Sequence, residues 1–122
     1  MIVLTVLVAG ALGSVVRFTI DSEIKRRWRR PFPLGTFVVN VTGSLVLGVL
    51  AGLVTFHGQP PEWQTVLGTG FCGGYTTFST ASVETVRLVQ AGERATAAAN
   101  ALGSVVSSVA ACALGLALVW VW

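Results

Sequence analysis

Charged residues are scarce in this sequence: Asp, Glu, Lys and Arg make up 11% of its 122 residues. A typical soluble domain carries about 25%. Hydrophobic residues reach 53%, and the mean hydropathy is +0.77. This balance excludes a water-soluble globule and predicts one all-α integral membrane domain over residues 1–122. Four spans of about 20 residues would fill it, at roughly 2–20, 34–56, 63–89 and 95–120.

Cysteine, histidine and mid-span carboxylates are also few. Cys72 and Cys112 both lie in apolar segments, and two cysteines are too few for a disulfide framework. The single histidine, His57, has no second ligand at metal-binding spacing. No nucleophile with a neighbouring base is evident, so an enzyme is not expected. A proton-coupled exporter would normally place an ionisable group in mid-membrane, and its absence favours passive movement of a small ion.

Basic residues are missing from the loop at 57–62 and from both termini, but they gather elsewhere. The run Lys25-Arg-Arg-Trp-Arg-Arg30 separates the first two spans, and Arg17, Arg87 and Arg94 lie near the first and third loops. The positive-inside rule therefore predicts that loops one and three are cytoplasmic and both termini are outside. Such a run could touch RNA, but between apolar spans it favours a loop that binds anionic membrane lipid, with no nucleic-acid partner.

The third span contains an unusual polar stretch from Gly68 to Thr80 within an uncharged run. Paired glycines, Gly73-Gly74, are followed by β-branched and hydroxyl residues, which are poor choices for the middle of a helix. The pattern predicts a helix broken near residues 73–76 at mid-membrane, whose freed carbonyls and hydroxyls would form an ion or substrate site. The alternative is a continuous, tightly packed helix crossing built on small residues.

Polar residues also follow one face of two other spans. Thr36 and Asn40 are four residues apart on the second span, and Asn100, Ser104 and Ser108 recur every four residues on the fourth. These neutral groups could line water or form interhelical hydrogen bonds. Since four helices enclose little volume, assembly with a second chain is expected. Small residues that suit close helix contacts occur at Gly10, Gly13, Gly48 and Gly52.

The stretch Gly70-Phe-Cys-Gly-Gly-Tyr-Thr-Thr-Phe-Ser-Thr80 resembles the Fluc (CrcB) fluoride channels. Further matches, which extend the resemblance over essentially the whole chain, are Gly10-Ala-Leu-Gly13 with Arg17, Pro33-Leu-Gly-Thr36, Asn40-Val-Thr-Gly-Ser44, and Ser104 with Ser108. The resemblance implies a passive fluoride channel in a prokaryotic cell membrane that lowers cytoplasmic fluoride. It also implies an antiparallel dimer with two pores and a structural sodium ion at its centre, held by the main-chain carbonyls of Gly73 and Thr76.

The resemblance also assigns candidate pore residues to this chain. The expected fluoride pathway comprises Thr36, Asn40, Phe78, Ser79, Thr80, Ser104 and Ser108. Amide and hydroxyl hydrogens would replace the water around fluoride, and a Phe ring would offer its positive edge. Arg17 and Glu84 are expected in a vestibule, although an arginine near a span end can also simply reach the headgroups.

Two departures from the family pattern affect the expected assembly. The family's second pore-lining Phe is replaced by Ala81, and Asn100 stands where Tyr is frequent. The strong charge bias favours insertion in one orientation, hence a heterodimer with a paralogous subunit of opposite topology. A homodimer with an altered pore remains open, as does a non-conducting or half-active subunit. A small multidrug transporter is a weaker alternative, because the first span lacks the membrane-embedded Glu of that class.

Overall fold

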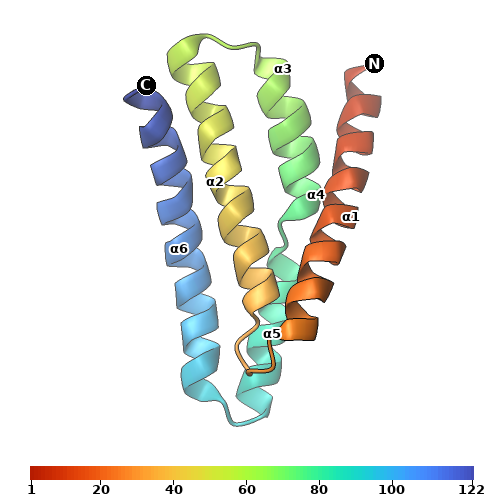
Figure 1. Ribbon diagram of the computed structural model, residues 1–122, viewed down its shortest axis with the longest axis vertical. Helices are drawn as coiled ribbons and strands as arrows, with labels where there is room; N and C mark the ends of the chain where they lie inside the picture. Colours follow the sequence, from red (N-terminus) through yellow and green to blue (C-terminus); the bar gives the residue numbers. More distant parts are fainter.

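The protein is entirely helical. The computed structural model describes residues 1–122 and arranges them as four roughly parallel rods (Figure 1). Three rods are single helices, long and apolar enough to cross a membrane by length and composition: α1 (Ile2–Arg27), α2 (Leu34–His57) and α6 (Arg94–Trp120). The fourth rod is composite and consists of α3 (Pro61–Trp63), the π-helix η1 (Gln64–Cys72), α4 (Gly73–Tyr75) and α5 (Phe78–Gln90).

The two ends of the molecule differ in charge. Both termini lie at one end, together with the connection between α2 and α3 (Figure 1). The connections between α1 and α2 and between α5 and α6 lie at the other end, and with them the basic run from Lys25 to Arg30. The fold therefore gathers the basic residues of the first and third loops at one end. The orientation of that end in a membrane stays a prediction.

Local sequence signals account for the helix ends near the loops. Gly58, with φ of 62°, follows α2 in the left-handed conformation that favours glycine. Pro61 opens α3, where its missing N–H is not needed. Gly92, with φ of 82°, turns the chain between α5 and α6.

The composite rod is interrupted at Thr76 and Thr77, not at the glycine pair. Gly73 has helical dihedrals (φ −62°, ψ −39°), whereas Thr76 (φ −80°, ψ 159°) and Thr77 (φ −148°, ψ 123°) are extended. The expectation that Gly73-Gly74 would break the helix is therefore wrong. The Thr77 side chain caps α5 instead, because its Oγ1 accepts a hydrogen bond from the Thr80 amide at 3.2 Å. The depth of this interruption in a membrane stays a prediction.

Gly74 of the composite rod and Gly13 of α1 allow these two elements to pack closely. A Cβ at Gly74 would collide with the Gly10 carbonyl, and one at Gly13 would collide with the Phe71 carbonyl. The absence of side chains at Gly13 and Gly74 therefore allows a close helix contact of the small-residue kind. The contact with α1 compensates for the low helix propensity of Gly74, whereas nothing lies close to Gly73.

The second close contact joins α2 and α6, which pack along most of their length. A Cβ at Gly48 would collide with the Cys112 carbonyl, and one at Gly115 would collide with the Leu45 carbonyl. Gly52 lies against Val119, whose Cβ would be 2.8 Å from an added methyl. The predicted packing face at Gly48 and Gly52 is confirmed.

Gly74→Ala should destabilise the fold, whereas Gly103→Ala should not. The new methyl at position 74 meets backbone atoms of α1, and overpacking of this kind typically costs about 1–3 kcal/mol. Gly103 is also inside a helix but has open space around it, so alanine there should be neutral or stabilise by up to about 1 kcal/mol. Thermal unfolding in detergent measures both; an equal effect of the two substitutions would contradict the packing account.

Candidate functional site

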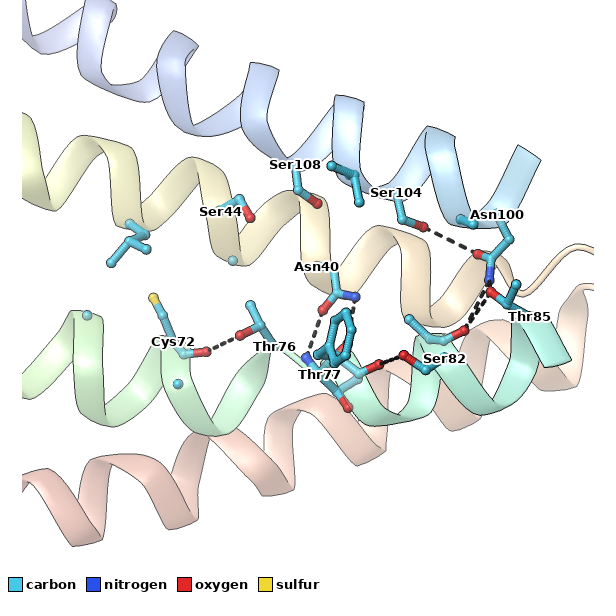
Figure 2. A pocket seen from close by; sticks show the side chains of 18 of the residues that line it. Asn40, Ser44, Cys72, Thr76, Thr77, Ser82, Thr85, Asn100, Ser104 and Ser108 are labelled. Carbon is cyan, nitrogen blue, oxygen red and sulfur yellow. Dashed lines mark hydrogen bonds between the residues drawn. The ribbon is translucent and has the colours of Figure 1, made fainter. Parts of the chain in front are cut away.

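An uncharged groove lined by apolar and neutral polar residues runs along the fold between α2, the composite rod and α6 (Figure 2). Its volume is about 700 Å³. No Asp, Glu, Lys, Arg or His lines it. Its polar side chains are all neutral amides or hydroxyls: Asn40, Ser44, Thr76, Thr77, Ser82, Thr85, Asn100, Ser104 and Ser108.

Asn40 holds the extended residues at the centre of this groove. Its Nδ2 donates to the Thr77 carbonyl at 2.9 Å, and its Oδ1 accepts from the Thr77 amide at 2.8 Å (Figure 2). One side chain on α2 therefore satisfies both backbone groups of a residue that has left the helix. Each such group, if buried without a partner, would cost about 1–3 kcal/mol. This clamp stabilises the interruption at Thr77, and one amide hydrogen of Asn40 remains for another acceptor.

The interruption leaves main-chain carbonyls without their helical partners. In a continuing helix the Thr77 amide would bond the Gly73 carbonyl, but it bonds Asn40 instead. The Thr76 amide completes the last regular bond, to the Cys72 carbonyl at 2.8 Å, and no hydrogen bond ends on the Thr76 carbonyl. Carbonyl oxygens freed in this way are suitable ligands for a hard cation.

The hydroxyl groups of the groove divide into engaged and free ones. Ser82 donates to the Phe78 carbonyl at 2.9 Å, Thr85 to the Ala81 carbonyl at 2.8 Å, and Ser104 to Asn100 Oδ1 at 3.3 Å. Ser44 and Ser108 make no hydrogen bond, and they face the groove from α2 and α6 (Figure 2). Their hydroxyl hydrogens are therefore available to an acceptor in the groove.

Asn100 links α6 to α5 at one end of the groove. It is only 1% exposed, and its Nδ2 donates to Thr85 Oγ1 at 2.8 Å and to the Ala81 carbonyl at 3.4 Å. Asn100, which stands where Tyr is frequent in the family, therefore has its side-chain amide satisfied by hydrogen bonds to α5. Ala81 lines the groove next to it and, being small, leaves that part of the groove unfilled.

The structure brings together some of the predicted site residues and separates others. Asn40, Phe78, Ser104 and Ser108 line the groove, as do Gly73 and Thr76. Thr36, Thr80 and Arg17 line a different cavity of about 90 Å³ between α1, α2 and α5. Ser79 is exposed and lines neither. Their roles in conduction stay predictions.

Glu84 belongs to an ionic cluster at the basic end of the molecule. Its Oε1 accepts from Thr36 Oγ1 at 3.1 Å and lies 3.5 Å from Lys25 Nζ, which pairs with Asp21 at 2.7 Å. Buried atoms of this cluster, namely Arg17 Nε, Asp21 Oδ1 and Glu84 Oε2, have no protein partner. Such groups are ordinarily satisfied by ordered water or an ion.

Sequence reasoning did not assign Ser44, Thr77, Ser82 or Thr85 to the site. Ser44 follows Asn40 by four residues, so the helical period already put it on the same face. Thr77 carries no local signal of this kind, since its role depends on Asn40, which is 37 residues away in the sequence.

These features define a small multi-pass membrane protein with an uncharged groove that carries neutral hydrogen-bonding side chains. Comparison with known families identifies it further: residues 4–116 match the family described as "CrcB-like protein, Camphor Resistance (CrcB)", and the chain belongs to this family. The family resemblance found in the sequence is therefore confirmed.

Curated relatives support the same assignment. The chain is 49% identical to "Fluoride-specific ion channel FluC 1" of Leifsonia xyli subsp. xyli, with 95% of this chain and 85% of the relative covered. It is 49% identical to "Fluoride-specific ion channel FluC 2" of Cutibacterium acnes, with 97% of each covered. A Mycobacterium tuberculosis protein, also named FluC 2, is 46% identical, with 90% and 84% covered. These relatives are named as ion channels, not as enzymes.

Proposed function

We propose that this protein is a subunit of a passive, fluoride-selective channel in a prokaryotic cell membrane, which lowers cytoplasmic fluoride. The single observation that carries the proposal is the groove: neutral hydrogen-bond donors line it and no carboxylate does. The names of the relatives supply the identity of the ion. A small multidrug transporter fits less well, because its coupling requires an ionisable group in the membrane.

Selectivity for fluoride would come from close donors. Fluoride is small and strongly hydrated, so a pathway must replace its water with hydrogens at short range. The free hydroxyls of Ser44 and Ser108 and the remaining amide hydrogen of Asn40 supply them. Phe78 is 86% exposed at the groove, so its ring can present its positive edge to an anion.

A structural sodium ion fits the carbonyls at the interruption. Gly73 and Thr76 both line the groove, their carbonyls lack their helical partners, and oxygen ligands suit a hard cation. Bound there, sodium would supply positive charge beside the anion pathway. The chain's own contribution is twofold. The Asn40 clamp takes the Thr77 amide away from the Gly73 carbonyl, and the Thr77 hydroxyl takes the Thr80 amide away from the Thr76 carbonyl.

A second subunit would complete the channel. Nine neutral polar side chains line the groove, and exposing them to lipid would be costly, so a partner would cover it. We favour a heterodimer with a paralogous subunit of opposite topology, because the basic residues gather at one end and Ala81 removes one expected ring. The alternative is an antiparallel homodimer whose pores lack that ring. In the heterodimer, this subunit could be half-active or non-conducting alone.

Ser44→Ala and Ser108→Ala should each slow fluoride efflux from liposomes about tenfold. Each removes a free donor whose hydrogen bond to an anion is worth about 1.5–3 kcal/mol, part of which water recovers. Ser82→Ala is the matched control, because the Ser82 hydroxyl also lines the groove but is engaged by the Phe78 carbonyl. Equal rates for all three variants would contradict the assignment of the free hydroxyls to the pathway.

A further inference from the structure

A second pocket lies at the basic end of the molecule, away from the groove. It has a volume of about 370 Å³ and is formed by the end of α1, the connection to α2, the start of α2 and the second half of α5. This volume is in the range of ordinary ligand pockets. In Figure 1 the connection between α1 and α2 passes beside α5 at this end.

Two arginines give the pocket a net positive charge. Lys25, Arg30 and Arg87 line it together with Glu84. Lys25 is held by Asp21 and Glu84, so the charges of these residues largely offset one another. Arg30 and Arg87 form no ion pair and are exposed, although they come from segments 57 residues apart in the sequence. Two uncommitted guanidinium groups beside one cavity suit a phosphate oxyanion.

The loop that carries Arg30 is fixed before any ligand binds. Trp28 Nε1 donates to the Phe32 carbonyl at 2.8 Å, which holds the indole ring across the loop. The Arg30 guanidinium lies 5.5 Å from the centre of this ring, at cation–π distance. The site is therefore preorganised, which reduces the entropy lost on binding.

Apolar side chains form the rest of the pocket wall. Trp28, Phe32, Leu34 and Leu88 line it next to the arginines. A free phosphate ion would gain nothing from this surface, whereas the glycerol and first acyl carbons of a lipid would be desolvated against it. The pocket also lies where the apolar helices reach the basic loops, and tryptophan is typical of that interface.

We propose that this pocket binds the phosphate headgroup of an anionic phospholipid, with Arg30 and Arg87 as its ligands and Trp28 as the support that orients Arg30. The site is separate from the groove, so it does not depend on the proposed conduction. The sequence predicted only that the basic loop binds anionic lipid. The pocket gives this binding a location and two ligand residues.

Native mass spectrometry of the full chain in detergent tests the proposal. Phosphatidylglycerol should bind in preference to phosphatidylcholine of the same acyl chains. Arg30→Gln with Arg87→Gln should weaken phosphatidylglycerol binding about ten- to thirtyfold. Arg29→Gln with Arg94→Gln is the matched control, since it removes the same charge from residues that do not line the pocket. It should weaken binding less than about threefold.

Three outcomes decide between the possible ligands. Retention of most of the affinity by Arg30→Lys with Arg87→Lys, together with an unchanged melting temperature of all variants, would support a charge-based site. Equal losses in the pocket pair and the control pair would overturn the proposal. Saturable binding of inorganic phosphate, with no preference between the two lipids, would assign the pocket to a free anion and would also overturn it.

Discussion

Asn40→Asp is expected to reduce fluoride efflux at least about 100-fold. The substitution places a negative charge in an otherwise neutral groove. At an effective dielectric constant of about 20, two like charges about 4 Å apart repel by about 4 kcal/mol, and each 1.36 kcal/mol of barrier slows a step tenfold. The new carboxylate also faces the Thr77 carbonyl, to which the amide of Asn40 now donates. Fluoride-electrode recordings of proteoliposome efflux measure the effect.

The control for Asn40→Asp must add the same charge elsewhere. Gln90→Glu makes the same chemical change at an exposed position at the end of α5, outside the groove, and should leave efflux within about twofold of the original rate. The acid at position 40 can still accept from the Thr77 amide through Oδ1, so the protein should remain folded, which gel filtration would verify. Unchanged efflux in a folded Asn40→Asp protein would remove Asn40 from the pathway.

A cysteine in the connection between α2 and α3 is expected to be labelled almost entirely from outside the cell. Seven of the eight Lys and Arg residues lie in or near the two loops at the end opposite this connection, and the eighth, Arg17, lies within α1. A bias of this size favours one orientation, because short loops rich in Lys and Arg are retained in the cytoplasm. Glu62→Cys provides the exposed thiol, and a membrane-impermeant maleimide applied to intact cells reads its side.

The matched position for the labelling experiment is Gln90→Cys, which lies at the other end of the molecule. It should react only after the cells are permeabilised. The unsubstituted chain gives the background from Cys72, which is buried, and Cys112, which lies within α6. Labelling of Glu62→Cys in equal amounts from both sides would show dual topology, and it would support a homodimer over a heterodimer.

The periodic features of the fold were accessible from the sequence. Four-residue spacing placed Asn100, Ser104 and Ser108 on one face, and the structure finds all three at the groove. The packing role of Gly48 followed equally from local pattern. Helical periodicity and residue size are properties of a short segment, so one sequence is enough to interpret them.

The interruption of the composite rod depends on distant residues, and its position was therefore harder to predict. Local propensity pointed to Gly73-Gly74, but both residues are helical, and Gly74 packs closely against α1. The extended residue is Thr77, whose backbone groups find their partners in the side chain of Asn40 on another helix. Thr36 and Asn40 illustrate the same limit: they share a helix face, yet one contacts Glu84 and the other contacts Thr77.

The central claim is that this chain forms part of a passive pathway for fluoride, and ion efflux from liposomes tests it most directly. Liposomes loaded with fluoride or with chloride would carry this chain alone, or this chain together with a candidate paralogous subunit. We predict rapid fluoride efflux without a proton gradient, negligible chloride efflux, and a rate for the pair well above that of the single chain. Folded protein that releases neither ion in either preparation, or that releases chloride as fast as fluoride, would contradict the account.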